Sequence, residues 1–298
     1  MLSYELMDIK FCSILSMYWS PEQAGTSMLL YRKKRKHGLS LEAEAMSISE
    51  TAHKNHEKLF PERQSTWKVT DPELLEIFEN FAFDEVMEHG KLDEKTRMLV
   101  ILASLIAQQT LSEYKTMLEA ALNVGVKPVE AKELVYQSVP YCGFAKVVDF
   151  IDSTNEILIK RGIELPLKRQ ATITRETRYE KGFALQKEIF GDEAIETMYR
   201  NCPDNQLPIQ RFLSDNCFGD YYTRQGLDLP MRELLTFSMI LSLGGCEPQL
   251  KGHIQGNANV GNDKEMLFDV IVQLLPYLGY PRTLNAIRCL NEALPDEQ

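Results

Sequence analysis

Three side chains that could take part in a reaction lie close together in the second half of the sequence: Glu233, Cys246 and His253. An imidazole can take up or release a proton at neutral pH, and a nearby carboxylate can support that transfer. A thiol can be oxidised or act as a nucleophile. The three residues therefore indicate either proton-transfer or thiol chemistry.

Two helices must position these side chains. Residues 232–261 predict a strongly apolar helix, a break at a pair of glycines, and a second helix that opens near Cys246. Cys246 and His253 then share one helix face but lie roughly 10 Å apart along the axis, so they cannot hydrogen bond directly. Gln249 stands one turn before His253 and can contact it. We expect Gln249 to help bind a substrate.

Glu233 lies on the first of the two helices. Counted from the turn between them, Glu233 is roughly 18 Å and His253 roughly 12 Å along its helix. This mismatch leaves open whether the carboxylate reaches the imidazole. Two further alternatives are open: His253 could be a core histidine satisfied by a carbonyl group, and Cys246 could be a helix-start cysteine without redox function.

The same pattern occurs earlier in the chain. Asn-Val-Gly at 123–125 recurs at 259–261, and Pro-Tyr at 140–141 recurs at 276–277, in both cases 136 residues later. The Leu-Asp pair at 92–93 recurs 135 residues later, so the second copy carries one extra residue upstream of Cys246. The chain is therefore predicted to contain two repeats of one fold.

The first copy lacks the three reactive side chains. Met98 follows the arginine that aligns with the residue before Glu233, Thr110 stands in place of Cys246, and Met117 stands in place of His253. We therefore expect the first copy to be structural, with Met117 as an apolar filler and no polar pocket around it.

These motifs resemble the carboxymuconolactone decarboxylase family, which includes the alkylhydroperoxidase D proteins. The resemblance rests on the Leu-Asp pair before an apolar helix, on GCEPQLKGH at 245–253, and on LLPYLGYPRTLNA at 274–286. It implies an all-α fold of two tandem alkylhydroperoxidase D-like helical units. The expected divisions are an N-terminal extension at 1–50, for which partial disorder is one interpretation, a first unit with a degenerate site at 51–160, a linker at 161–175, and a second unit that bears the site at 176–298.

The resemblance implies two kinds of enzyme. Decarboxylating members lack the CxxC motif, depend on a histidine at the place of His253, and use neither metal nor organic cofactor. The first interpretation is thus cofactor-free decarboxylation or isomerisation of a small carboxylated or carbonyl substrate, with His253, Glu233 and Cys246 as catalytic residues and Gln249 and Tyr277 as substrate-binding residues. The alternative is an alkylhydroperoxidase D-like thiol peroxidase that uses Cys246. Gln249 stands where its second cysteine would be, so another thiol would have to resolve the oxidised one. A non-catalytic, oligomeric binding protein is the third interpretation.

The composition of the chain bears on its partners, its compartment and its cofactors. The chain has 298 residues and a net charge of -10, which argues against a nucleic-acid partner. Its six cysteines form no CxxC motif, which favours a reducing cytoplasm. The apolar run near the start is too short to cross a membrane, so we expect no anchor and no export. No metal-ligand or nucleotide-binding motif occurs, and the very apolar helices predict a homo-oligomer, most simply a trimer.

Overall fold

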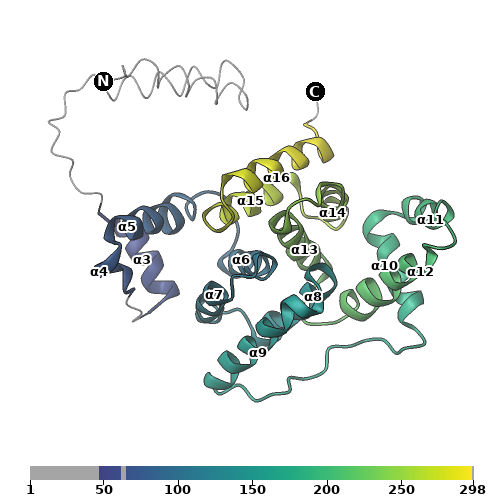
Figure 1. The fold of residues 1–298 in the computed structure, drawn as a ribbon, viewed down its shortest axis with the longest axis horizontal. Helices are drawn as coiled ribbons and strands as arrows, with labels where there is room; N and C mark the ends of the chain where they lie inside the picture. Colours follow the sequence, from purple (N-terminus) through teal and green to yellow (C-terminus); the bar gives the residue numbers. More distant parts are fainter. Residues whose placement is uncertain (1–46, 62–64, 297–298) are drawn as a thin grey trace. The chain divides into compact units, whose positions relative to one another are not determined.

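The computed structural model describes residues 47–61 and 65–296, in which every regular element is a helix (Figure 1). The all-α fold class predicted from the sequence is confirmed. The expectations for the N-terminal extension up to residue 46 lie outside the described residues.

The first repeat opens with short helices and continues with four longer ones. Its elements are α3 (Glu50–Leu59), α4 (Trp67–Thr70), α5 (Pro72–Asn80), the π-helix η1 (Phe81–Glu85), α6 (Glu94–Gln108), α7 (Leu111–Asn123), α8 (Pro128–Cys142) and α9 (Phe144–Lys160).

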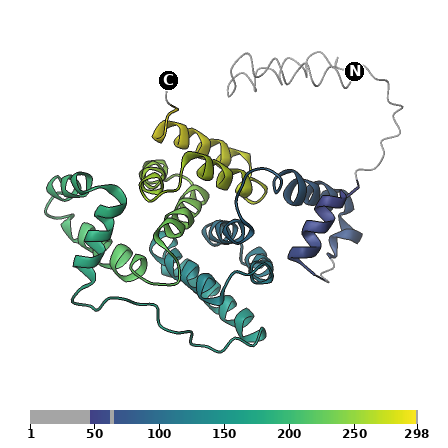
Figure 2. The same cartoon turned by 180° about the vertical axis from the view of Figure 1, so that it is seen from behind.

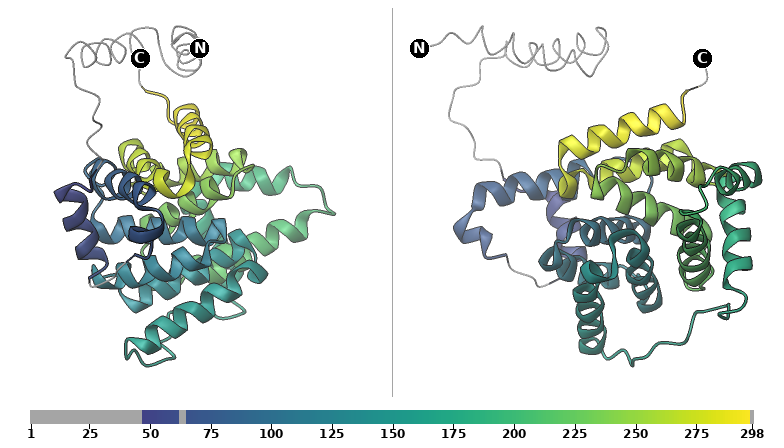
Figure 3. Two further views of the ribbon diagram at one scale, coloured as in Figure 1. Left: turned by 60° about the vertical axis from the view of Figure 1, so that its left-hand side comes forward. Right: turned by 45° about the vertical axis from the view of Figure 1, so that its right-hand side comes forward.

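The second repeat follows the same order after an extended connection, which runs along the lower edge of the right-hand view in Figure 3. Its elements are α10 (Arg178–Phe190), α11 (Asp192–Arg200), α12 (Leu207–Phe212), the π-helix η2 (Leu213–Tyr222), α13 (Leu229–Leu243), α14 (Glu247–Asn259), α15 (Lys264–Leu278) and α16 (Tyr280–Ala293). Thus α6 to α9 correspond to α13 to α16, in agreement with the repeat seen in the sequence.

Helices α6 and α13 form the centre of the core. Each begins at the aspartate of a Leu-Asp pair: the Asp93 carboxylate accepts a hydrogen bond from the Thr96 backbone N–H, and Asp228 accepts one from that of Met231. Such caps satisfy backbone donors that a helix start leaves free. Both helices are apolar on nearly every face, and they pack against each other, as Figures 1 and 2 show.

Each repeat also packs one further helix on the central helix of the other repeat. Helix α8 of the first repeat packs on α13 of the second, and α15 of the second packs on α6 of the first. Residues from Ser47 onward accordingly form one compact unit. The two repeats are thus two copies of one motif within a single compact unit, and the exact boundaries expected for them stay a prediction.

A buried ion network fastens α8 to α13. Arg232 is 1% exposed and donates to the Glu133 carboxylate at 3.0 Å and to the Gln137 side-chain oxygen at 2.7 Å. Glu133 also accepts hydrogen bonds from the Arg224 guanidinium. Since a buried charge without a partner is strongly destabilising, these contacts fix which surfaces of the two repeats meet.

Equivalent apolar side chains stay exposed at the start of α9 and α16. Phe144 and Tyr280 occupy matching positions in the two repeats and are each 62% exposed. Val148 and Leu284, one turn later, match in the same way. These faces offer surface to a second copy of the chain, and the homo-oligomer stays a prediction. No helix among the described residues is both long and apolar enough to cross a bilayer.

Helix α10 crosses η2 with backbone against backbone. A Cβ atom on Gly182 would lie 2.0 Å from the Ser214 carbonyl oxygen, which no real contact permits. Gly182→Ala should therefore lower the free energy of unfolding by about 1 to 3 kcal/mol or more, measured by urea titration. Gly252 is the matched control, because a Cβ there meets nothing within 4 Å. Gly252→Ala should raise stability by about 0.5 to 1 kcal/mol, and equal effects of the two substitutions would contradict the close crossing.

Candidate active site

The structure brings Glu233 and His253 into direct contact. His253 Nδ1 lies 2.9 Å from Glu233 Oε2, and the glutamate side chain is 0% exposed while that of the histidine is 12% exposed. When the carboxylate is ionised, the proton of the neutral imidazole is on Nδ1, which donates a hydrogen bond to Oε2. The lone pair is then on Nε2, which has no hydrogen-bond partner in the described part of the chain. The contact that the sequence left open is thus made.

A glycine allows the two helices to approach this closely. Gly256 lies nearly one turn after His253 on α14, and a Cβ atom there would stand 3.0 Å from Glu233 Oε2 and 2.9 Å from a ring atom of Phe190. Distances counted along the helix axes from the turn do not show how closely the two helices approach each other. They therefore could not decide whether Glu233 contacts His253.

Asn257 fixes α14 against α13 beside the pair. Its side-chain amide donates to the backbone carbonyl of His253 at 2.7 Å and to that of Glu233 at 3.1 Å. Its oxygen accepts from the amide of Asn262 at 2.8 Å. Asn257 is 0% exposed, so these bonds hold both site residues at a fixed separation.

The second oxygen of Glu233 is held by a tyrosine from η2. The Tyr222 hydroxyl donates to Glu233 Oε1 at 2.8 Å and lies 2.5 Å from the Thr236 hydroxyl. Burial, followed by the charge of Glu233, raises the pKa of Tyr222 well above its ordinary value. The phenol therefore stays protonated and remains a donor to the carboxylate.

The first repeat contributes Tyr141 to this network. The Tyr141 hydroxyl donates to that of Tyr222 at 2.9 Å, and its ring meets the His253 imidazole edge-on at 5.8 Å between centroids. The Cys217 thiol lies 3.6 Å from the same hydroxyl. Burial raises the pKa of Cys217 to about 12, so this thiol is protonated and is a poor nucleophile. Phe190 flanks the imidazole on another side, at 5.3 Å.

The other predicted site residues lie elsewhere. Cys246 is the N-cap of α14, two turns before His253, and its thiol contacts the Gly244 carbonyl oxygen at 3.6 Å. Gln249 is exposed. Tyr277 packs edge-on against Phe78 of the first repeat, and its role in substrate binding stays a prediction.

The exchange of α8 and α15 between the repeats explains the position of Tyr277. Tyr141 and Tyr277 are equivalent residues, and each contacts side chains of the other repeat. Tyr141 contacts His253 of the second repeat, and Tyr277 lines a small cavity with Met98 and Met117 of the first. Sequence reasoning missed Tyr141 because periodicity does not show which repeat completes a site. The repeated Pro-Tyr pair was the available signal.

The first repeat has no counterpart of the buried pair at these positions. Met98 and Met117, which align with Glu233 and His253, are 2% and 1% exposed and belong to the apolar core. Met117 nevertheless borders a cavity with polar side chains, among them His56 and Glu79. The expectation that no polar pocket forms around Met117 is therefore wrong.

Comparison with known proteins agrees with this architecture. The family model of the carboxymuconolactone decarboxylase family matches twice, at residues 72–156 and 208–292, which together make up more than half of the chain. The chain belongs to this family. Both matches end within the last helix of a repeat, so the tandem arrangement predicted from the sequence is confirmed.

Two decarboxylases are among the similar proteins. The 4-carboxymuconolactone decarboxylase of Acinetobacter baylyi is 29% identical over 121 residues, which cover 41% of this chain and 90% of that protein. The nitrosuccinic acid decarboxylase npaB of Metarhizium robertsii is 25% identical over 118 residues, which cover 40% of this chain and 82% of that protein. Each relative thus has roughly the length of one repeat of this family member.

The described side chains of this family member form no group of three or more His, Cys, Asp or Glu residues placed to hold a metal ion. The chemistry that its own residues offer is proton transfer at His253 Nε2, supported by a carboxylate that Tyr222 and the imidazole both hold.

The hydrogen bond from Tyr222 gives a stability test of this network. Tyr222→Phe would leave a buried carboxylate oxygen without its donor and should lower the free energy of unfolding by about 1 to 3 kcal/mol. Tyr221 is the matched control, because it is the adjacent residue and its hydroxyl makes no hydrogen bond within the described part of the chain. Tyr221→Phe should change stability by less than about 0.5 kcal/mol in the same urea titration. An equal loss in both variants would show that Oε1 does not depend on this phenol.

Proposed function

We propose that the protein is a decarboxylase-like enzyme that uses His253 and Glu233 for cofactor-free acid/base chemistry on a small carboxylated substrate. The observation that carries this proposal is the 2.9 Å contact between His253 Nδ1 and a carboxylate that is wholly buried. Family membership and two similar decarboxylases support the same reaction class.

The proposed reaction needs one proton. Loss of CO₂ breaks a carbon–carbon bond and leaves its electron pair on the substrate, where a conjugated carbonyl group can accept it. The carbon that held the carboxylate then takes a proton. His253 Nε2 delivers it as an imidazolium and regains a proton from water, so charge and atoms balance. In an isomerisation the same nitrogen would remove a proton and return it at another carbon.

Glu233 acts through the histidine in this proposal. Its Oε2 fixes the imidazole in the orientation that presents Nε2, and its charge stabilises the imidazolium without becoming protonated itself. The hydrogen bond from Tyr222 to Oε1 limits the movement of the carboxylate. Tyr141 and Phe190 then limit the space around the ring, so a substrate can reach only its free edge.

The two relatives indicate the substrate class. Their names specify a carboxymuconolactone and nitrosuccinic acid, which are both small and carboxylated. The thiol peroxidase alternative rests on Cys246 alone, and that thiol contacts a backbone carbonyl oxygen two turns away from the imidazole.

His253→Ala should abolish the proposed reaction while the fold persists. Loss of a general acid/base lowers turnover by about 10² to 10⁴-fold, and we expect Glu233→Gln to cause a smaller loss in the same direction. The measurement is CO₂ release from 4-carboxymuconolactone and from nitrosuccinic acid, with circular dichroism as the check on folding. His89→Ala is the matched control because His89 is an exposed histidine outside this site.

Cys246→Ser separates the two enzyme interpretations. It should leave CO₂ release within about twofold of the native rate, because a two-turn separation of roughly 10 Å keeps the thiol out of contact with His253. Unchanged turnover in His253→Ala would refute the acid/base proposal, and peroxide consumption that disappears with Cys246→Ser would support the thiol peroxidase interpretation in its place.

A further inference from the structure

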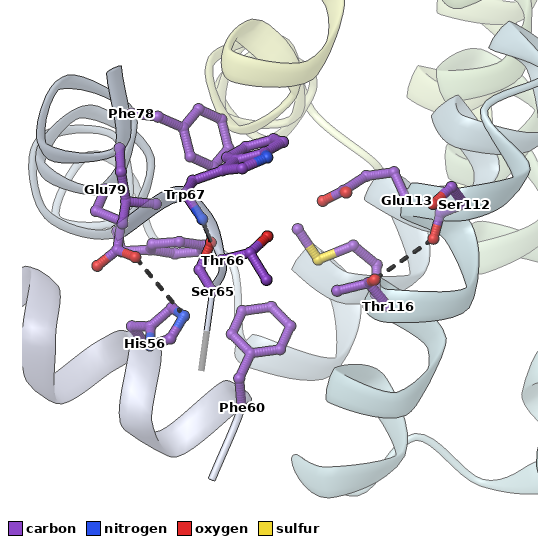
Figure 4. Close-up of a pocket in the computed structure, with 13 residues that line it drawn as sticks. His56, Phe60, Ser65, Thr66, Trp67, Phe78, Glu79, Ser112, Glu113 and Thr116 are labelled. Atoms are coloured by element: carbon purple, nitrogen blue, oxygen red, sulfur yellow. Dashed lines mark hydrogen bonds and ion pairs between the residues drawn. The ribbon is translucent and has the colours of Figure 1, made fainter. Parts of the chain in front are cut away.

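A cavity in the first repeat contains a second histidine–carboxylate pair, outside the site described above. The cavity has a volume of about 360 Å³ and is bordered by α3, α5 and α7 and by the start of α4 (Figure 4). His56 comes from α3 and Glu79 from α5. Figure 4 shows this pair on one side of the cavity, facing Ser112 and Thr116 on the other.

Glu79 is buried and His56 is half-buried, and both side chains have unused hydrogen-bonding capacity among the described residues. The Glu79 side chain is 4% exposed and the His56 side chain 15% exposed. Their nearest atoms, His56 Nε2 and Glu79 Oε1, are 3.8 Å apart, which is too long for a hydrogen bond. In the described part of the chain neither side chain has any other hydrogen-bond partner. Since buried carboxylates are almost always hydrogen-bonded, a ligand in the adjoining cavity could supply the donor that Glu79 does not have among the described residues.

In the second repeat, the side chains at the equivalent positions hydrogen bond directly to each other. Gln186 aligns with His56 when Leu59-Phe60 is matched to Ile189-Phe190, and Ser214 aligns with Glu79 at the offset of the Leu-Asp pairs. The Ser214 hydroxyl donates to the Gln186 side-chain oxygen at 2.7 Å. The Tyr199 hydroxyl completes that group at 2.7 Å from the Ser214 hydroxyl. The neighbouring rings match as well, because Phe60 and Phe83 meet at 5.9 Å just as Phe190 and Phe218 meet at 5.8 Å.

Each repeat therefore keeps one ionisable pair, but at different positions. The second repeat has Glu233 and His253 on its buried helix pair and a neutral, satisfied pair at the other place. The first repeat has methionines on the buried helix pair and the ionisable His56–Glu79 pair at the other place.

The lining of the cavity indicates the chemistry of the ligand. Aromatic and aliphatic side chains form much of the wall, among them Phe60, Phe83 and Met117. The carboxylates of Glu79 and Glu113 also border it, and no lysine or arginine is among the described residues that do. This lining suits an uncharged ring better than an anion.

The state of the histidine fits the same kind of ligand. Burial lowers the pKa of His56, and the nearby Glu79 charge only partly offsets that effect. A neutral imidazole has one nitrogen that accepts a hydrogen bond, and the carboxylate beside it also accepts. A ligand hydroxyl has one proton, which it can donate to the Glu79 carboxylate, and its oxygen can accept a hydrogen bond from the N–H of the His56 imidazole.

We propose that the first repeat holds a separate binding site for a small, uncharged aromatic compound with a hydroxyl group, of the phenol class, whose hydroxyl donates to the Glu79 carboxylate and accepts a hydrogen bond from His56. The ring would lie among Phe60, Phe83 and Met117. The site is independent of the reaction proposed for His253.

Phenol is the probe, and benzoate, which has the same ring and a negative charge, is its comparison. Trp67 borders the cavity, so the indole N–H signal of the full-length, ¹⁵N-labelled protein reports on occupancy, with Trp67→Phe to identify that signal. Phenol should shift the signal saturably, and benzoate should bind at least about tenfold more weakly. The absence of a saturable shift with phenol, or equal affinity for benzoate, would overturn the proposal without recourse to any variant.

A matched substitution tests the pair itself. His56→Gln combined with Glu79→Ser installs the residues that the second repeat already accommodates, and it should weaken phenol binding by about tenfold or more. His253→Ala should leave phenol binding unchanged, whatever it does to CO₂ release. Binding that persists in the double variant, or that disappears with His253→Ala, would show that the ligand does not use the His56–Glu79 pair.

Discussion

The candidate active site depends on the complete burial of one carboxylate. Glu233 is 0% exposed, and removing a carboxylate from water costs several kcal/mol unless donors replace the lost hydration. Those donors come from α14 and η2, and a phenol on α8 of the first repeat supports the one on η2. The first repeat thus takes part in the hydrogen-bond network around this charge, although both direct donors belong to the second repeat.

Much of the fold follows from the sequence, whereas part of the site does not. The Leu-Asp caps, the apolar central helices and the repeated motifs are local signals, and they predict the elements and the tandem order. Two contacts are not local. The approach of Glu233 to His253 depends on the absence of a side chain at Gly256, and Tyr141 reaches the site from the other repeat.

The two repeats differ in a way that position-by-position alignment conceals. Methionines at 98 and 117 suggest that the first repeat has lost its polar groups. His56 and Glu79 lie on other helices, and in the sequence they align with Gln186 and Ser214, which carry no charge. Only the spatial arrangement shows that His56 and Glu79 border a cavity together with Met117. Loss of a motif in one copy of a repeat is therefore weak evidence that the copy has lost its pocket.

The ion network between α8 and α13 has a consequence for synthesis. Glu133 and Arg232 are 99 residues apart in the chain, so the carboxylate leaves the ribosome well before the guanidinium that neutralises it. At the usual pace of translation this interval is about 5 to 20 s. During that time the first repeat has neither the ionic partner of α8 nor the apolar surface of α13. A nascent chain that has reached the linker therefore exposes a face that only the second repeat can cover, and it has to be protected until that repeat emerges.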